Sequence, residues 1–554
     1  MTTRAIPSPA TVEVVRYAFM SGAEQMRRNL YRSAYSPVIY EMKDCSVGMY
    51  DSAGDLLGQA PGLPFFLGSL GGTVKGVLER VGAAAFLDGD VWLVNDSAIC
   101  GSHLNDVTVF SPVFVDRELR GFSGAKAHWN DVGAKDAGYV SDSTNIFQEG
   151  LRIPPIRIIR EGVLDQETLD LLSLNSRFPG PLVGDLMASV AACRTGNQRF
   201  DAIVARYGWE QVDAAIERFF VQAELADRES VAAIPDGVYA AEGFLDNDGI
   251  NTEPVKAAVT VTVDSDEMVI DLEGSGPENE GSINSGLVQT KSALQQAFKF
   301  LVNPESPVCG GNFRNLEIRV PQGSCFDPSP TAACLHYGPH LMLAMDLVVK
   351  ALSDAVPERA AAGHVGDSWN VTLVNERGRP PFLSGESLVG GWGAHAAGDG
   401  ESALIHSAAG DFKNFPVEVM EHRYPLRIHH HGLRVGSGGQ GRYRGGLGIV
   451  RRYEILEAAR LSLWFERTSQ PSWGLVGGDD GDAPEVKVSV PGKPPELVLK
   501  CNARAVPAGT IVDVRTGGGG GWGDKRERSP ELLAEDHRLG LVPVADNASQ
   551  PSKG

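Results

Sequence analysis

The sequence predicts an α+β fold for a large chain of several segments, with β-rich N- and C-terminal parts and helical segments between them. Three observations support this fold class. Short apolar runs with strand-like patterns recur near both ends of the chain. Stretches rich in leucine and alanine give helical periodicity across residues 165–234. At 554 residues, the chain is longer than one ordinary hydrophobic core supports.

Residues 1–160 are interpreted as an N-terminal α/β region. An apolar stripe along residues 11–33 predicts an amphipathic helix. Residues 46–50 and 56–57 resemble strands, and the segment between them has the aspartate and glycine of a hairpin turn. The sequence further predicts a helix at 71–81 and strands at 91–94, 107–115 and 119–122.

Residues 161–235 are expected to form a separable helical segment, because residues 182–200 and 211–226 are strongly periodic. Residues 236–410 are interpreted as a central α+β region. The alternating runs at 258–263 and 268–272 favour an antiparallel pair of strands, and helical periodicity returns at 290–302 and 340–356.

Residues 411–525 are predicted to be a glycine-rich, β-dominated C-terminal region. Its glycines, as at 436–441 and 517–521, are interpreted as tight turns that need positive φ. A nucleotide-binding loop is not favoured, because the chain has no G-x-x-x-x-G-K-[ST] motif. Residues 526–554 are expected to be a loose tail.

Composition excludes several classes of function. A net charge of −20 and a pI near 5.1 argue against nucleic-acid binding. The sequence shows neither a signal peptide nor an apolar run of membrane-spanning length, so we expect no membrane contact and a cytoplasmic location. The seven cysteines include no C-x-x-C pair and are expected to be reduced, mostly buried thiols.

The most informative motif is a doubled H-x-x-D, with His103 and Asp106 before the predicted strand 107–115, and His128 and Asp131 after the next strand. If the two strands form a hairpin, both motifs reach the same end of the sheet. Imidazole and carboxylate ligands together suit Mn²⁺, Fe²⁺ or Zn²⁺. The alternative is that the two histidines are only hydrogen-bonded near strand ends.

Further carboxylates are candidates for the same site. Either Glu41 or Asp44 could add a ligand from the segment before residue 46. Asp96 could orient one of the metal ligands through a hydrogen bond without binding the metal itself. Asp96 and Asp131 are the residues that we predict to assist catalysis.

Other histidines are weaker candidates. Neighbouring residues on a strand point to opposite faces, so His429, His430 and His431 are expected to lie at a surface or core edge. His336 and His340 could line a cleft, although a turn at the start of a helix explains them more simply.

Taken together, the motifs resemble those of the hydantoinase B/oxoprolinase family, which includes subunits of cyclic amide hydrolases and of ketone carboxylases. The resemblance runs through nearly the whole chain. Its landmarks are GSHLNDVT at 101–108, AHWNDVG at 127–133, QEGLRIPP at 148–155, FPVEVME at 415–421, SGGQGRYRGGLG at 437–448, WGLVGG at 473–478 and TGGGGGWGD at 516–524.

The resemblance implies a divalent metal bound by His103, Asp106 and His128, with a carboxylate from the 41–44 segment, for which Asp44 is preferred. It also implies a hetero-oligomer with a hydantoinase A-type subunit that binds ATP and phosphorylates a carbonyl oxygen of a small molecule. The B-type chain would then complete the opening of a hydantoin, 5-oxoproline or lactam ring.

Two alternatives stay open at this level: a subunit of an ATP-dependent ketone carboxylase, and a non-catalytic subunit whose site has decayed. The chain also departs from the family pattern near the site, with Ser97, the run 100–102 and Ala134. These departures predict a pocket shaped for an unusual substrate.

Overall fold

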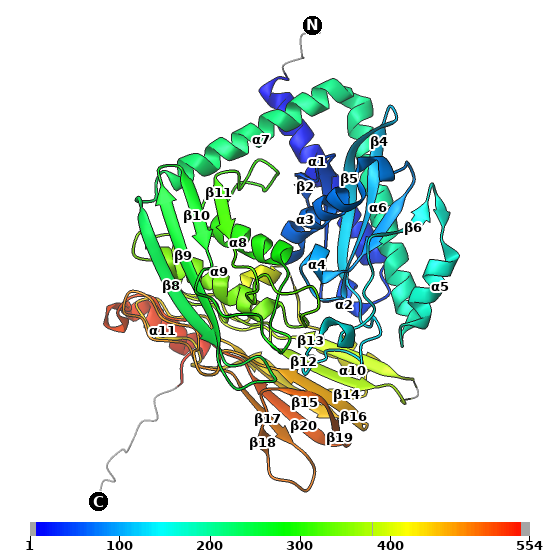
Figure 1. Cartoon of the computed structure of the whole chain (residues 1–554). Helices are drawn as coiled ribbons and strands as arrows, with labels where there is room; N and C mark the ends of the chain where they lie inside the picture. The colour runs from blue at the N-terminus through cyan, green and yellow to red at the C-terminus, as the bar shows by residue number, and fades with distance from the viewer. Residues whose placement is uncertain (1–6, 379, 411, 544–554) are drawn as a thin grey trace, which may run out of the picture.

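The computed structural model describes residues 7–378, 380–410 and 412–543. Within these residues, helices combine with four separate sheets, which confirms the α+β fold class (Figure 1). No helix of the described residues is long and apolar enough to cross a membrane. All seven cysteines are free thiols and six of them are buried, as the sequence predicted.

The N-terminal part is built on a seven-stranded sheet with the order β2-β1-β5-β4-β3-β6-β7. Helices α1 and α6 pack on one face and α3 packs on the other (Figure 1). Because both faces are covered, β4 is buried along most of its length, which explains why its successive residues Val109 and Phe110 are both apolar and join different cores. The elements are α1 Pro9–Ser33, α2 Pro37–Tyr40, β1 Cys45–Asp51, β2 Leu56–Gln59, α3 Pro64–Val81, β3 Val91–Val94, α4 Ser97–Cys100, β4 Asp106–Val115, β5 Glu118–His128, β6 Ile156–Arg160 and β7 Val163–Leu164.

The helical segment comprises α5 Gln166–Leu174, α6 Pro179–Tyr207 and α7 Trp209–Val231. It does not stand apart as the sequence suggested. The buried side chains of α6 belong to the same core as those of α1 and the sheet, because its apolar stripe needs a partner surface. Helix α7 then runs from this core to the central sheet, where Val231 joins a second core.

The central part contains a four-stranded sheet with the order β11-β10-β9-β8. Strands β9 and β10 form the antiparallel pair that the alternation predicted. Helix α9 packs on β8 and β9, while α8 contacts both α9 and α3 and so joins the central and N-terminal parts. The bounds are β8 Gly237–Leu245, β9 Val255–Asp264, β10 Glu267–Asp271, α8 Leu287–Leu301, β11 Leu316–Arg319 and α9 Gly338–Leu352.

The C-terminal part has two antiparallel sheets, with the orders β13-β12-β16-β19 and β14-β15-β20-β17-β18. A short helix precedes β14. The bounds are β12 Asn370–Asn375, β13 Phe382–Ser387, α10 Val417–Arg423, β14 Leu426–Leu433, β15 Ile449–Ile455, β16 Ala459–Trp464, β17 Glu485–Ser489, β18 Glu496–Leu497, β19 Cys501–Val506 and β20 Thr510–Arg515.

Most glycines of the C-terminal runs serve close packing of backbones rather than turns, which corrects the sequence interpretation. All five glycines of the run 517–521 have ordinary φ angles. A Cβ at Gly519 would lie 1.9 Å from the carbonyl oxygen of Trp392, and one at Gly518 would lie 1.9 Å from that of Ser437. Backbone segments therefore pass each other at distances that only glycine permits. Backbone hydrogen bonds join them, such as the one that the Gly519 amide donates to the Gly446 carbonyl.

The segment expected to be a loose tail contains a docked helix, α11 Pro530–Leu539. Ser529 caps its first turn. The carboxylate of Asp536 is buried and pairs with Arg528 at 2.6 Å and with Arg444 at 3.2 Å. These charged hydrogen bonds hold α11 on the glycine-rich region. Residues 544–554 of the predicted tail lie outside the described residues.

Candidate metal centre

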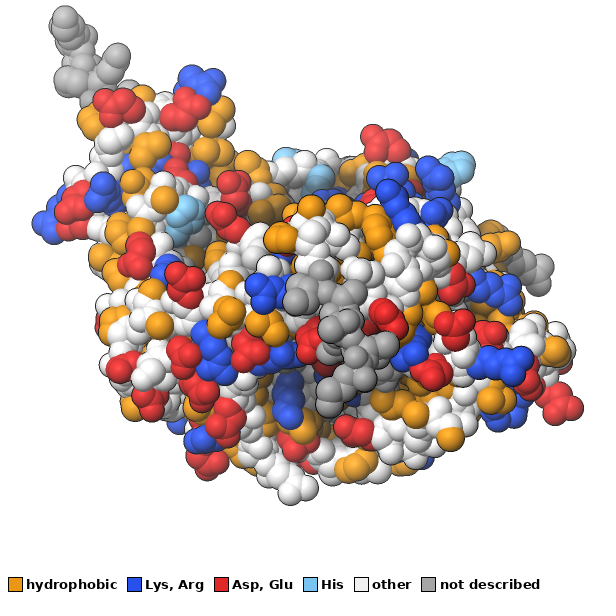
Figure 2. Space-filling view, turned by 90° about the horizontal axis from the view of Figure 1, so that it is seen from above, with side chains coloured by type: hydrophobic (Ala, Val, Ile, Leu, Met, Phe, Trp, Pro, Cys, Tyr) orange, Lys and Arg blue, Asp and Glu red, His pale blue; other side chains and the backbone are white. Residues whose placement is uncertain are grey.

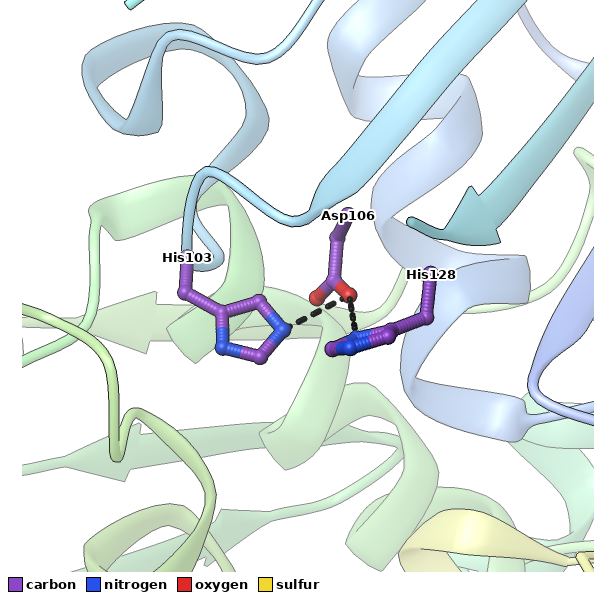
Figure 3. A group of neighbouring side chains, drawn as sticks. All are labelled: His103, Asp106 and His128. Carbon is purple, nitrogen blue, oxygen red and sulfur yellow. Dashed lines mark hydrogen bonds and ion pairs between the residues drawn. The ribbon is translucent and has the colours of Figure 1, made fainter. Parts of the chain in front are cut away.

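The two H-x-x-D motifs meet through the β4–β5 hairpin, as the sequence predicted. Asp106 is the first residue of β4 and His128 is the last residue of β5, and the register pairs them directly. Opposite residues in an antiparallel pair have side chains on the same face. His103 lies in the turn between α4 and β4, so local chain geometry brings all three side chains together (Figure 3).

The three side chains form a compact, buried group. Nε2 of His103 lies 2.8 Å from Oδ1 of Asp106, and Nδ1 of His128 lies 3.2 Å from the same oxygen. One ligand atom from each residue lies within 4.8 Å of the others. The Nδ1–H of His103 donates to the carbonyl of Leu335 at 3.0 Å, which leaves Nε2 facing Asp106. A second hydrogen bond of this kind is typical of metal-ligating histidines.

The surroundings of Asp106 keep its carboxyl ionised. Burial opposes ionisation of Asp106, yet the two histidines and their hydrogen bonds hold the pKa of its carboxyl below the ordinary range. Its Oδ2 is buried and has no hydrogen-bond partner among the described residues. An anionic oxygen that is both buried and unpaired needs a positive charge nearby.

Asp44 is the fourth side chain at the centre. It lies in the loop before β1, and its Oδ2 is 4.0 Å from Nδ1 of His128. The pKa of Asp44 is raised to about 7, and burial is the largest cause. The nearby His128 acts in the opposite direction, while the negative charge of Asp106 adds to the increase. Its Oδ1 also lacks a partner within the part of the chain that the structure describes. Asp44 therefore supplies a second unpaired carboxylate oxygen at the same place.

The structure does not bring Glu41, Asp96 or Asp131 into the cavity at this centre. Glu41 follows α2 and is partly exposed. The other two are held in separate hydrogen-bond networks. Asp96 caps α4 and pairs with Arg152 at 2.8 Å. Asp131 pairs with Arg177 at 2.9 Å, because its strand has already ended and the chain has turned away.

A cavity of about 80 Å³ lies at the candidate metal centre, between the N-terminal sheet and the central and C-terminal parts. Distant segments supply much of its wall, and no local pattern in the sequence marks them. Of these residues only His336 was a weak candidate, as a residue that could line a cleft. The wall includes Asp44, His103, Asp106, His128, Tyr139, His336, Tyr337, Asp367, Ser368, Trp369, Asn370 and Trp464.

The outer surface that Figure 2 shows carries acidic and basic side chains interspersed over the molecule. No broad basic stripe is visible on that face, in keeping with the net charge of −20. Among the described residues, the group of His, Cys, Asp or Glu side chains placed so that it could hold a metal ion is His103, Asp106 and His128, at and beside the paired ends of β4 and β5.

The family model for hydantoinase B/oxoprolinase matches residues 8–525. This chain belongs to the hydantoinase B/oxoprolinase family. It is 30% identical to a putative D-/L-hydantoinase B subunit of Pseudomonas sp. over 96% of this chain and 93% of the relative. Solved members of similar fold include the ATP-dependent caprolactamase of Pseudomonas jessenii, with 28% identity, a TM-score of 0.90 and coverage of 98% of this chain and 95% of the other.

The fold also extends to an acetone carboxylase, whose nucleotide-free structure has a TM-score of 0.86 and 21% identity. That match covers 97% of this chain and 78% of the other. At this identity the match shows a shared fold alone.

Where this hydantoinase B/oxoprolinase family member departs from the family motifs, the altered residues do not line the cavity. Ser97 and Cys100 lie in α4, Ser102 is fully buried, and Ala134 packs against Leu335 and Val140. Gly101 is required by contact, since a Cβ there would lie 2.3 Å from the amide nitrogen of Gln289. Any effect of these residues on the shape of the pocket must therefore act through the residues that line it.

Proposed function

We propose that this chain is the metal-containing B-type component of an ATP-dependent hydrolase of cyclic amides such as hydantoins, 5-oxoproline or lactams. The observation that carries the proposal is the buried group of His103, Asp106 and His128 with two unpaired carboxylate oxygens among the described residues, one on Asp106 and one on Asp44. Mixed nitrogen and oxygen donors of this kind fit Mn²⁺, Zn²⁺ or Fe²⁺.

His103, Asp106 and His128 would hold the cation, and Asp44 would complete the set. When bound, the cation would polarise a carbonyl oxygen and lower the pKa of water. The protein contributes orientation and exclusion of bulk water. The Leu335 carbonyl orients the ring of His103, and the three-residue group is almost fully buried beneath the central and C-terminal parts.

ATP would act in a partner of the hydantoinase A type. The relatives support this division, because one is named as the B component of a hydantoinase and another, from Pseudomonas jessenii, as the beta chain of a caprolactamase. The solved caprolactamase is described as ATP-dependent. This chain spans over nine-tenths of both relatives and has no P-loop motif. Phosphorylation of a carbonyl oxygen would supply the leaving group that an amide lacks.

The test uses this chain co-purified with its A-type partner. ADP release and products are measured with hydantoins, lactams and ketones, each with isotopically labelled bicarbonate. A ring-opened acid without retained label supports the hydrolase. A labelled carboxylate formed from a ketone would replace the proposal with the carboxylase, and absence of turnover with all three classes would contradict both.

A further inference from the structure

Two stacked aromatic side chains form part of the cavity wall beside the metal centre. The rings of His336 and Trp464 have centroids 3.7 Å apart and planes within 17° of parallel. His336 lies just before α9, and Trp464 is the last residue of β16. Only 5% of His336 and 2% of Trp464 is exposed. Neither residue belongs to the metal-ligating group.

The hydrogen bonds of His336 determine which ring nitrogen carries the proton. Nδ1 lies 2.7 Å from Oγ of Ser282, and the backbone amide of His336 donates to the Ser282 carbonyl at 3.1 Å. Among the described residues, Nδ1 is the one partner found for this hydroxyl. If Nδ1–H donated to Oγ, the hydroxyl proton and the Nε2 lone pair would both be buried without partners among the described residues, whereas a hydroxyl that donates to Nδ1 leaves only Nε2–H unpaired. The hydroxyl therefore donates to Nδ1, and Nε2 carries the proton.

Both rings present a buried N–H that lacks an acceptor within the described residues. These donors are Nε2 of His336 and Nε1 of Trp464. Ser282, which is bonded to the Nδ1 side of His336, does not line the cavity, whereas His336 and Trp464 both do. Unpaired buried donors are rare in native proteins and call for a ligand or water.

His336 is also kept neutral. Burial, the ammonium group of Lys500 and His103 hold its pKa well below the ordinary histidine value. Nζ of Lys500 lies 4.2 Å from the centre of the Trp464 ring and pairs with Glu466, so its charge is fixed behind the stack. A neutral imidazole with a protonated Nε2 donates a hydrogen bond without adding a second cation beside the metal centre.

We propose that Nε2–H of His336, with Nε1–H of Trp464 beside it, donates a hydrogen bond to an acceptor oxygen of the substrate in the metal cavity. This inference rests on the proposed function, because it takes the metal cavity as the reaction site. The ligand class is a carbonyl-type oxygen that carries no hydrogen, as in a cyclic amide. Such donors act most strongly where negative charge develops on that oxygen.

The first experiment tests the donor without relying on activity. The whole chain, labelled with ¹⁵N-histidine, is studied by NMR, and the His336 resonances are assigned with His336→Gln. We expect Nε2 to be protonated and Nδ1 unprotonated between pH 6 and 8. Titration with 2-pyrrolidone or acetone, two carbonyl probes, should shift the Nε2 resonance. A protonated Nδ1, or no shift with either probe, would overturn the proposal.

The second experiment measures kcat and KM of the complex with its A-type partner. His336→Phe removes the donor and keeps a stacked ring, whereas His336→Gln keeps an N–H near the Nε2 position. We expect kcat/KM to fall about tenfold to a hundredfold in the Phe variant and by less in the Gln variant. Metal content should equal that of the wild type in both, since neither substitution removes a ligand.

His340 provides the matched control. It is another buried histidine that is bonded to a serine, with Nε2 3.1 Å from Oγ of Ser285 and its ring 5.0 Å from that of Phe326, but it does not line the cavity. His340→Gln should leave kcat/KM within about twofold. A loss in His340→Gln as large as that in His336→Phe would indicate a structural role and contradict the proposal.

The two readouts separate this inference from the proposed function. If the complex opens no cyclic amide but the carbonyl probes shift Nε2, the proposed function fails while the donor stands. If cyclic amides are opened and His336→Phe is as active as the wild type, the donor fails while the proposed function stands.

Discussion

The carbonyl oxygen of Leu335 accepts a hydrogen bond from Nδ1 of His103 at 3.0 Å, although 232 residues separate the two in the chain. This contact turns Nε2 of His103 toward Asp106. The amide of Leu335 is itself held by Glu149, whose Oε1 lies 3.0 Å away. The candidate metal centre is thus built by the β4–β5 hairpin and oriented by the chain before α9.

Removing either histidine of the group should abolish tight metal binding. We expect His103→Ala and His128→Ala to lower affinity for Mn²⁺ or Zn²⁺ by at least about a hundredfold, because loss of a residue that merely orients a ligand already costs about 10–100-fold. Metal content after dialysis and chelator competition measure this loss. His429→Ala on exposed β14 is the control and should bind as the wild type. Unchanged affinity in both site variants would refute the assignment.

Asp44, rather than Glu41, should provide the fourth ligand. Asp44→Asn removes a negative charge whose nearest oxygen is 4.0 Å from His128, while Glu41→Gln changes a side chain outside the cavity. We expect the Asn variant to bind metal at least about tenfold more weakly and the Gln variant to bind normally. The same chelator competition measures both affinities. Weaker metal binding by Glu41→Gln than by Asp44→Asn would assign the fourth ligand to Glu41.

Glu149 should make stability depend on pH. Burial raises the pKa of its carboxyl to about 7, against hydrogen bonds from Ser143, Cys334 and Leu335 that lower it. Because its pKa is higher in the folded than in the unfolded protein, Glu149 makes its full contribution to the free energy of unfolding below about pH 4.5. This contribution is lost as the pH rises through about 7. A shift of this size corresponds to an effect on the order of 3 kcal/mol.

The comparison with Glu149→Gln isolates this effect, since the variant cannot ionise at this position. Thermal midpoints of both proteins are measured between pH 4.5 and 8. The wild-type midpoint relative to that of the variant should fall as pH rises. A constant difference across this range would show that Glu149 does not titrate there.

Gly519 should tolerate no side chain. A Cβ there would meet the Trp392 carbonyl oxygen at 1.9 Å, so Gly519→Ala must separate two packed backbones. We expect a loss of more than about 4 kcal/mol or failure to fold. Gly180, in the first turn of α6, has open space around its Cβ position, and Gly180→Ala should be neutral or stabilising. Thermal melting and soluble yield test the pair, and equal effects would disprove the packing argument.

Asp536 should anchor α11. Removing one partner of a buried ion pair costs about 3–5 kcal/mol, since the other charge is left unpaired. Asp536→Asn should therefore release α11 and expose sites after Arg528 to protease, with little change elsewhere. Glu535→Gln alters an exposed pair with Arg538 and serves as control. Equal cleavage rates in the two variants would contradict the anchoring role.

The sequence by itself determined the local parts of this protein. Periodicity located α1, the helices of the 165–234 region and the β9–β10 pair, because these patterns repeat within a few residues. The doubled H-x-x-D predicted the meeting of His103, Asp106 and His128, since a hairpin returns the chain to the same end of a sheet. The motifs also identified the family.

Only the tertiary structure decided what depends on distant contacts. It placed Asp44 in the cavity and left Glu41, Asp96 and Asp131 outside. It also stacked Trp464 on His336 and turned the glycine runs from expected turns into sites of close backbone packing. The physical reason is that hydrogen bonding and packing between segments hundreds of residues apart leave no periodic pattern in either segment.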